Sequence, residues 1–423
     1  MTKTVYILGV NHEAINVAIL LASLKMSVVV VGSAEALAQT LHHYQFDHQM
    51  GVLWQLYQSE QKIHLLTDKW LFLADEVLTQ AHTFWLFVDE LGADFCAQFA
   101  QHCHSPHSQI LLSGTDTVGA IQALAERFKS PWVFYLPFIF MKDGANFNTL
   151  FSPDLVLIGE KSADSHLQSD ILAFFIAHSN QHHIGDIKTV EFARSAIMVM
   201  LATRLSLMNE LARLADSENI NIKHVQTMMA KDKRVGGAYL SAGWGFGGKS
   251  LPSELQLLTD KFAQNRVSTS LLDAVSSINE DQKELIFRKF WRYFGGFIEN
   301  KRVVIWGAAY RCGTGRTMGS AIHPLLRLLW SYQIGTVVYG HHTQLELQEL
   351  YGQNPLLQLS DEPYGSLTQA DALFIINWSP VLRPDIGRLN QIRVPIFDAK
   401  NILSDDDVAA YQGAYFGIGR QKP

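Results

Sequence analysis

Cysteine is scarce in this chain, and long apolar runs and blocks of like charge are absent. The three cysteines, Cys96, Cys103 and Cys312, form neither a metal-ligand spacing nor an even disulfide set. We expect free thiols, as in a reducing cytoplasm. No apolar run reaches the ~18 residues that a membrane-spanning helix needs, and the chain opens on a strand-like segment rather than on the charged region of a signal peptide. The sequence therefore predicts a cytoplasmic protein without a membrane partner.

The charge balance argues against a nucleic-acid partner. The formal net charge is −6, the pI is about 6.3, and lysine and arginine form no run. Histidine is abundant, at 17 residues, but no acidic or cysteine partner stands at ligand spacing. We therefore expect no metal site. We also expect His182 and His183, like the other clustered histidines, to be solvated loop residues.

Short apolar segments alternate with amphipathic segments in the N-terminal part. With 423 residues, 48% of them hydrophobic, the chain is long enough for two or three domains with full cores. A helix is expected at Glu13–Leu24. Strands are expected at Val5–Val10, Ser27–Val31, Phe84–Val88, Gln109–Leu112 and Trp132–Leu136. This alternation predicts an α/β fold with a doubly wound parallel sheet.

The middle of the chain is helical in pattern, and a second strand–helix alternation follows it. Helices are expected at about Val190–Asp216, Asn221–Ala230, Pro252–Phe262 and Leu271–Tyr293. After a linker at Gly295–Lys301, strands are expected at Arg302–Trp306, Thr336–Tyr339, Ala372–Ile376 and Ile396–Phe397. We therefore predict a Rossmann-like domain at residues 1–189, a helical domain at residues 190–296 and a second Rossmann-like domain at residues 297–423.

A glycine-rich segment in the helical part carries the most specific signal. It reads Gly243-Trp244-Gly245-Phe246-Gly247-Gly248-Lys249-Ser250-Leu251-Pro252-Ser253-Glu254. So much glycine costs chain entropy, which suggests close approach of a ligand, with a merely tight turn as the alternative. The segment resembles the sugar loop and nucleophile of the UDP-glucose/GDP-mannose dehydrogenases, G-x-G-[FY]-G-G-x-C-[LF]-P-K-D. Ser250 stands at the cysteine, Ser253 at the lysine and Glu254 at the aspartate.

The serine at the nucleophile position has a chemical consequence. In the family that this chain resembles, NAD oxidises the sugar C6 twice, through a thiohemiacetal and a thioester on the cysteine. A serine hydroxyl is a weak nucleophile unless a neighbouring base takes its proton. No lysine, histidine or aspartate accompanies Ser250 at the matching positions. We expect Ser250 to be a structural relic, with a serine hemiacetal in a new reaction as the alternative.

The other catalytic positions of the family are also altered. Residues 191–210 resemble its central helix, with Arg194 at the lysine and Met198 at the asparagine. Arginine stays protonated and cannot act as a base, and methionine cannot stabilise an oxyanion by hydrogen bonding. Thr115 matches the threonine that helps to position catalytic water in S-x-T-V-P-V-G. Asp143 matches the second glutamate of N-P-E-F-L-R-E-G, whose first glutamate is replaced by an apolar residue.

The dinucleotide-binding fingerprint G-x-G-x-x-G/A is damaged. Gly9 and Ala14 stand at its first and third positions, but Asn11 replaces the second glycine, which lets a pyrophosphate approach the backbone. Asparagine tolerates positive φ, so we expect the turn to survive. The second strand ends without the acid that binds ribose hydroxyls, and Asp89 and Glu90 follow the strand at 84–88, where they would repel a pyrophosphate. We expect NAD, the cofactor that the resemblance implies, to bind weakly or not at all.

The nucleotide-sugar side of the family pattern is kept. Arg234-Val235-Gly236 and Tyr239-Leu240 precede the glycine loop as in R-[IV]-G-x-x-[FY]-L, where the arginine reaches a neighbour's substrate across a dimer. Segments at 302–320, 397–401 (F-D-G-R-N) and 417–420 (I-G-R) extend the resemblance over nearly the whole chain. The residues that the resemblance assigns to nucleotide-sugar binding are Arg234, Tyr239, Leu240, Gly243, Gly245, Phe246, Gly247, Gly248, Arg311 and Lys400.

Three functions remain open at this point. The first is a degenerate member of the family, a homodimer through the helical domain, which binds a UDP- or GDP-linked sugar without oxidising it and has a regulatory or partner role. The second is an active NAD-dependent nucleotide-sugar 6-dehydrogenase with altered catalytic residues. The third is a structural dimeric interaction protein. NADH production separates the second from the others, and nucleotide-sugar binding separates the first from the third.

Overall fold

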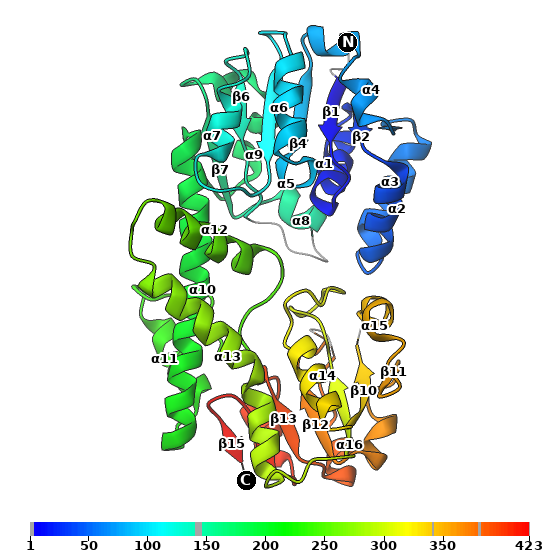
Figure 1. The fold of residues 1–423 in the computed structure, drawn as a ribbon, viewed down its shortest axis with the longest axis vertical. Helices are drawn as coiled ribbons and strands as arrows, with labels where there is room; N and C mark the ends of the chain where they lie inside the picture. Colours follow the sequence, from blue (N-terminus) through cyan, green and yellow to red (C-terminus); the bar gives the residue numbers. More distant parts are fainter. Residues whose placement is uncertain (1–3, 140–145, 341, 380–381, 423) are drawn as a thin grey trace. The chain divides into compact units, whose positions relative to one another are not determined.

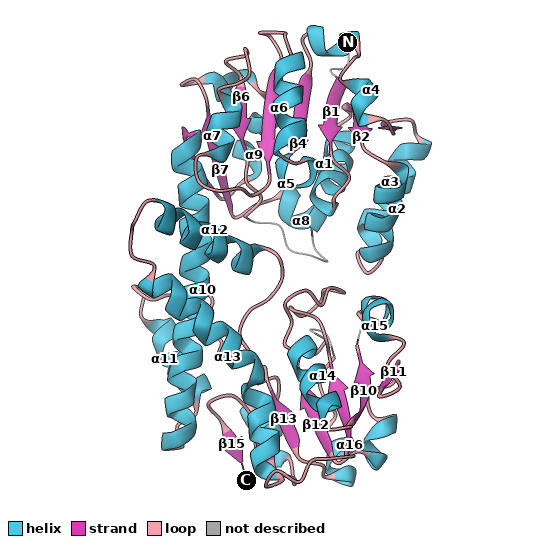
Figure 2. Ribbon diagram, viewed as in Figure 1, coloured by secondary structure: helices cyan, strands magenta, loops and turns pink. Residues whose placement is uncertain are grey.

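The computed structural model describes residues 4–139, 146–340, 342–379 and 382–422. The chain forms two compact units, residues 1–197 and residues 198–423, each built on its own sheet (Figure 1). The α/β class predicted from the sequence is confirmed, because both sheets are largely parallel and lie among helices (Figure 2). The division into three domains stays a prediction.

The first unit contains an eight-stranded sheet in the order β3-β2-β1-β4-β5-β6-β7-β8. Every pairing in it is parallel except β6 with β7, which is antiparallel. The strands are β1 (Thr4–Leu8), β2 (Ser27–Val31), β3 (Ile63–Leu66), β4 (Thr83–Phe87), β5 (Gln109–Ser113), β6 (Val133–Tyr135), β7 (Leu155–Glu160) and β8 (Gln181–Asp186). Apolar clusters cover both faces of this sheet, as a doubly wound architecture requires.

The helices of the first unit connect these strands. They are α1 (His12–Ser23), α2 (Ala34–His43), α3 (His48–Ser59), α4 (Lys69–Phe72), α5 (Val88–Leu91), α6 (Ala93–His102), α7 (Ala120–Ala125), α8 (Asn146–Phe151) and α9 (Asp170–His178). Helix α1 is the most deeply packed, since every residue from Ala14 to Ala22 is buried. The α1 N-terminus is therefore held rigidly at the end of β1.

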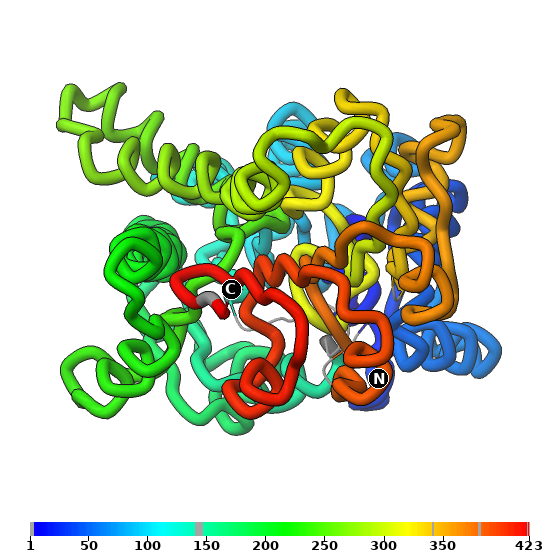
Figure 3. The backbone as a smooth tube through the Cα atoms, turned by 90° about the horizontal axis from the view of Figure 1, so that it is seen from below, coloured from blue at the N-terminus to red at the C-terminus, as the bar shows by residue number. Residues whose placement is uncertain are grey.

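The second unit combines long helices with a seven-stranded sheet. Its helices are the C-terminal part of α10 (Ile187–Glu218), α11 (Ile222–Lys231), α12 (Ser250–Gln264), α13 (Ser270–Tyr293), α14 (Ile322–Ser331), α15 (Gln344–Tyr351), α16 (Ile386–Ile392) and α17 (Asp405–Ala410). The sheet order is β11-β10-β9-β12-β13-β14-β15, with only β14–β15 antiparallel among its pairings. Figure 3 shows the chain passing from α13 into the yellow-to-red segment that forms this sheet.

The strands of the second sheet, with the bounds that the structure gives them, are β9 (Arg302–Trp306), β10 (Gly335–Tyr339), β11 (Leu357–Ser360), β12 (Ala372–Ile375), β13 (Ile396–Asp398), β14 (Tyr415–Phe416) and β15 (Gln421–Lys422). In each sheet the strand order reverses beside the first strand, at β1 between β2 and β4 and at β9 between β10 and β12. Ligands of open α/β sheets bind at the carboxyl ends of the strands at such a reversal. The residues that follow β1 and β9 are therefore the expected positions for ligands in the two sheets.

The sequence located most elements to within a few residues but missed several strands. His182 and His183, expected in a loop, lie in β8, and their exposure left no apolar alternation to reveal that strand. Both remain exposed, as expected of solvated residues. Among the described residues, no helix is long and apolar enough to cross a membrane.

Candidate functional site

The glycine loop at residues 243–248 is held by three buried amide side chains. Asn209 on α10 accepts a hydrogen bond from the Gly243 N–H at 2.9 Å, and Gln282 on α13 donates to the Gly243 carbonyl at 2.8 Å. Asn279 accepts from the Phe246 N–H at 2.8 Å and donates to the Phe246 carbonyl at 3.2 Å. A loop with few side chains has little apolar surface to bury, so these bonds fix its shape.

Sequence reasoning did not single out these three amides as loop supports, although α13 carried a signal for two of them. Its buried positions recur at helical spacing, and Asn279 and Gln282 fall within the apolar stripe. Polar side chains are buried only when hydrogen-bonded. The core-facing residues of α13 are Leu272, Val275, Asn279, Gln282, Ile286, Phe287 and Phe290.

The loop packs closely against the segment that follows β9. A Cβ atom at Gly247 would lie 2.5 Å from the Gly319 carbonyl oxygen, and one at Gly248 would lie 2.7 Å from the Tyr310 ring. The Gly248 N–H also donates to the Met318 carbonyl at 2.8 Å. Gly248 has φ +79°, so both its conformation and its surroundings require glycine. The structure thus brings the two segments together.

Lys400 completes this cluster. Its ammonium lies 5.3 Å from the centre of the Trp244 ring, and its stem lies against Gly243. Burial lowers the pKa of Lys400, while the nearby Cys312 thiol acts in the opposite direction. Arg311 adds a second cation, 6.0 Å from the Tyr310 ring centre. A half-buried ammonium beside an aromatic ring and glycine backbone suits an anionic, polar ligand.

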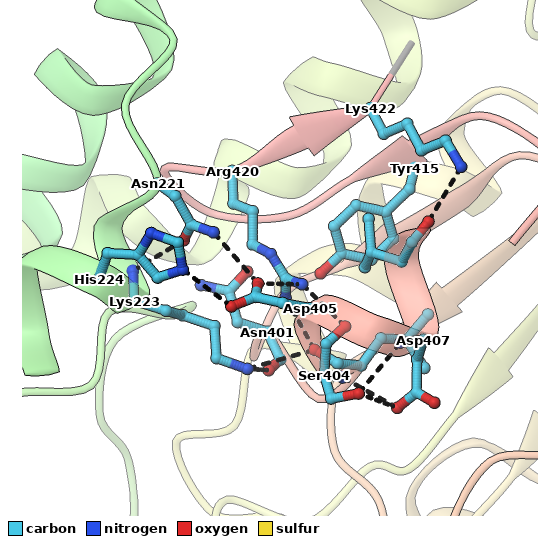
Figure 4. Close-up of polar contacts among 12 residues, drawn as sticks. Asn221, Lys223, His224, Asn401, Ser404, Asp405, Asp407, Tyr415, Arg420 and Lys422 are labelled. Carbon is cyan, nitrogen blue, oxygen red and sulfur yellow. Dashed lines mark hydrogen bonds and ion pairs between the residues drawn. The ribbon is translucent and has the colours of Figure 1, made fainter. Parts of the chain in front are cut away.

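The segment that carries Lys400 is fixed by a polar network at the end of the chain (Figure 4). Arg420 donates to the carbonyls of Leu403 and Ser404 at 2.7 and 2.8 Å and forms an ion pair with Asp405 at 2.6 Å. Asn401 bonds both the N–H and the carbonyl of Ile418. The residues that match the family's F-D-G-R-N and I-G-R motifs therefore have a structural part in this chain.

A cavity opens at the carboxyl ends of β9, β10 and β12. Its lining residues are Gly307, Ala308, Ala309, Cys312, Gly313, Thr314, Tyr339, Asn377, Trp378 and Ser379. The exposed Cys312 thiol donates to the Asn377 side-chain oxygen. The Trp306 and Trp378 rings lie 4.4 Å apart at the same edge. This is the position that strand reversal predicts for a ligand in the second unit.

The other predicted residues of the second unit differ in exposure. Arg234 is highly exposed and pairs with Asp232 at 2.7 Å rather than with the loop. Tyr239 is exposed, in a left-handed conformation with φ +58°, and Leu240 is buried in the core. Ser250 is exposed as the first residue of α12, and Glu254, one turn later, is fully buried.

The predicted catalytic residues Arg194 and Thr115 lie on different segments of the first unit. Arg194 and Glu191 are buried on α10, and Thr115 is half-buried after β5. The Glu191 carboxylate accepts from the N–H groups of Gly119, Ile121 and Gln122 at 2.9–3.2 Å, so it caps α7. Burial raises the pKa of Glu191.

Asp143 lies outside the described residues. Met198 is buried on α10, as expected for a residue that packs in the core. Within the described part of the chain, no group of three or more His, Cys, Asp or Glu residues could hold a metal ion.

The fingerprint loop turns at Gly9 and enters α1 through Asn11. Asn11 has φ −67°, so the loop forms without a positive φ at this residue. Its side chain instead caps α1, accepting from the Ala14 N–H at 2.9 Å. Gly9 keeps φ +129° at the end of β1, as the tight turn requires. Ser33, which follows β2, similarly caps α2 through the Ala36 N–H at 3.1 Å.

Glu90 occupies the space in front of this loop. Its carboxylate accepts from the Val10 N–H at 2.8 and 2.9 Å and from the Asn11 N–H at 2.9 Å. A Cβ atom at Gly9 would lie 2.7 Å from a Glu90 oxygen. A pyrophosphate bound at this loop would need the same amides. The residues as they stand therefore do not fit a dinucleotide pyrophosphate.

Known proteins are similar to this chain over the region that contains the glycine loop. Residues 188–281 match the central domain of the UDP-glucose/GDP-mannose dehydrogenase family. The UDP-glucose 6-dehydrogenase of Pseudomonas aeruginosa is 29% identical over 67% of this chain and 64% of its own length. A putative UDP-glucose 6-dehydrogenase of Bacillus subtilis is 25% identical over 66% of this chain and 65% of its own length. The chain thus matches slightly less than two thirds of the length of these relatives.

Solved structures extend the likeness to nearly the whole chain. A UDP-glucose dehydrogenase from Pyrobaculum islandicum has a TM-score of 0.80 at 17% identity and covers 99% of this chain and 98% of its own. The UDP-D-ManNAc dehydrogenase of Pyrococcus horikoshii has a TM-score of 0.77 at 17% identity, with 99% of both chains covered. At such identities the likeness shows the fold. The central-domain match and the curated relatives thus make this chain similar to the UDP-glucose/GDP-mannose dehydrogenase family.

Proposed function

We propose that this protein binds a nucleotide sugar in its second unit and does not carry out the four-electron oxidation of the family. The observation that carries the proposal is the glycine loop. Buried amides shape it, and it packs on Tyr310 and against Lys400. The relatives are named as UDP-glucose 6-dehydrogenases, which supports a UDP-linked sugar as the ligand, with a GDP-linked sugar as the alternative.

The proposed binding mode uses the cations beside the loop. Lys400 and Arg311 neutralise the diphosphate, the glycine backbone of 243–248 contacts the sugar, and the nucleoside lies on the surface at the carboxyl end of β9, where the small cavity opens. Charge-assisted bonds from lysine or arginine to phosphate are stronger than neutral ones. The largely buried Trp378 and Tyr339 line this cavity and give its wall an apolar, aromatic character.

The loss of oxidation follows from the residues at the reacting positions. Ser250 carries no thiol, Arg194 cannot exchange a proton at neutral pH, and Met198 offers no hydrogen-bond donor. Each altered group lowers the rate, and groups that act as a unit do not lose activity additively. We propose a regulatory or partner role for the protein, in place of an enzymatic one.

A homodimer through α10 is part of the proposal. Met200, Leu207 and Leu214 recur every seven residues along this helix and are 60%, 46% and 58% exposed. A heptad-spaced apolar stripe suits a facing helix of a second copy. Exposed apolar side chains in a row are a mark of an interaction surface.

Calorimetric titration with UDP-glucose and GDP-mannose tests the binding proposal. One of the two is expected to bind the wild-type protein. Lys400→Met should weaken that binding by roughly ten- to a hundredfold, since an ionic hydrogen bond contributes about 1.5–3 kcal/mol. Lys231→Met, at an exposed position on α11, is the control and should change nothing. Failure of the wild type to bind either compound would refute the proposal.

A second measurement addresses turnover. Purified protein with NAD and UDP-glucose is expected to produce no NADH, and Ser250→Cys alone should not restore it, because the partners of the thiol are missing too. Steady NADH production by the wild type would favour the active dehydrogenase with altered residues instead.

A further inference from the structure

The loop after β1 carries an anion that belongs to the protein itself. Three hydrogen bonds of 2.8–2.9 Å join the Glu90 carboxylate to the N–H groups of Val10 and Asn11. Backbone amides at the start of a helix attract negative charge through the helix dipole and their free donors. In a dinucleotide-binding loop the pyrophosphate satisfies these donors.

We propose that Glu90 replaces the cofactor pyrophosphate as a permanent internal ligand of the fingerprint loop, so that removal of its carboxylate, rather than repair of Asn11, is what opens the loop to a dinucleotide. This inference deepens the proposed loss of oxidation by naming its structural cause in the first unit. It does not depend on nucleotide-sugar binding in the second unit.

The contacts around Glu90 indicate that its carboxylate fills the pyrophosphate position, rather than only repelling a pyrophosphate by its charge. Although the residue as a whole is exposed, its carboxylate reaches the loop and lies where a Cβ at Gly9 would clash. Partial burial raises the pKa of the Glu90 carboxyl, while the two amides act in the opposite direction. Asp89, the neighbouring acid, lies beside Gly114 at the end of β5, one strand further along the sheet.

Two further N–H groups near the expected cofactor position are also hydrogen-bonded to side chains of the protein itself. The Asn11 side chain bonds the Ala14 N–H, and the Ser33 hydroxyl, at the end of β2, bonds the Ala36 N–H. In a dinucleotide-binding unit an acid near the end of the second strand would bind ribose hydroxyls. Each of these two side-chain caps stabilises its helix, because it satisfies an N–H group at the helix N-terminus.

Three variants separate the two residues. Asn11→Gly, Glu90→Ala and the double variant are titrated with NAD and with pyrophosphate alone. Glycine is a good helix N-cap, so Asn11→Gly should fold normally. We expect Asn11→Gly to bind NAD no better than the wild type, and Glu90→Ala to bind at least tenfold more tightly than the wild type. The double variant should bind at least as tightly as Glu90→Ala.

Asp89→Asn is the matched control, because it removes the same charge one residue away. Its affinity for NAD should stay within about twofold of the wild type. If Asp89→Asn and Glu90→Ala gained equal affinity for NAD, the proposal that Glu90 fills the pyrophosphate position would be overturned. General charge repulsion would then explain the effect. A wild type that binds NAD as tightly as Glu90→Ala, or a Glu90→Ala protein that gains no affinity, would overturn the proposal as well.

Amide hydrogen exchange gives a readout without any ligand. The amides of Val10 and Asn11 should be protected in the wild type and should exchange at least tenfold faster in Glu90→Ala, with the strand amides of β1 unchanged. Equal exchange in the two proteins would contradict the proposed contact. UDP-glucose titration of Glu90→Ala distinguishes the two proposals, since faster exchange without UDP-glucose binding would leave this inference standing while the proposed function fails.

Discussion

Replacing Asn279 by alanine should destabilise the second unit and loosen the glycine loop. The side chain is buried and bonds both the N–H and the carbonyl of Phe246, at 2.8 and 3.2 Å. Alanine would leave both backbone groups without these partners in a buried setting. Each such orphaned group costs about 1–3 kcal/mol, so for the two groups we expect the free energy of unfolding to fall by about 2–6 kcal/mol.

Urea unfolding followed by tryptophan fluorescence measures this change. The midpoint should fall while the denaturant slope stays constant, because the buried surface of the native state is retained. Under conditions where the variant remains folded, its affinity for the bound nucleotide sugar should also fall, since Gly245 and Phe246 lose their support.

Asn265→Ala provides the matched control. The exposed Asn265 side chain, directly after α12, bonds only the Lys261 carbonyl among the side-chain contacts described for it, so its loss should change stability by less than about 0.5 kcal/mol. If Asn279→Ala were no less stable than Asn265→Ala, the idea that buried amides fix the loop would be refuted.

Three further predictions concern other parts of the chain. The His323 Nε2–H donates to the Thr317 carbonyl at 2.9 Å, and Nδ1 shares a hydrogen bond with the Tyr351 hydroxyl at 2.8 Å. Burial lowers the pKa of His323 below the usual 6.5. The wild type should therefore lose stability as the pH falls below 6.5, and a His323→Gln variant with the same acid slope would argue against this. Glu191→Ala should lower the free energy of unfolding by about 2 kcal/mol through loss of the α7 cap, and an unchanged melting temperature would contradict the capping role. Leu207→Glu should yield monomers in sedimentation experiments, whereas a monomeric wild type would remove the basis for the α10 dimer.

Much of the fold was readable from local pattern. Continuous apolar runs such as Thr83–Phe87 in β4, buried at every position, signal internal parallel strands. Strand β8 was missed because its residues are exposed or half-exposed, so neither alternation nor an apolar run is present. Such an edge strand forms because β7 offers a partner, and a single segment's pattern carries no information about its partner.

The candidate site was predictable in part. The sequence pointed to the glycine loop, to Lys400 and to the acids after β4, because each stands in a recognisable motif. It did not predict that Glu90 would bond Val10 and Asn11, since those residues lie 79–80 positions away and meet only through the pairing of β1 with β4. Nor did the sequence predict that the Asn11 side chain caps α1 by accepting from the Ala14 N–H.

The shape of the glycine loop depends on residues other than the one at the reacting position, Ser250. Three buried amides on α10 and α13 hold the loop. Asn209, Asn279 and Gln282 encode the curvature of the loop from positions that meet no substrate in the proposed binding mode. A change of the residue at position 250 would therefore leave the shape of the loop intact. This chain is therefore a suitable scaffold for enzyme engineering. New reactive groups can be introduced at position 250 next to a glycine loop whose shape is fixed by other residues.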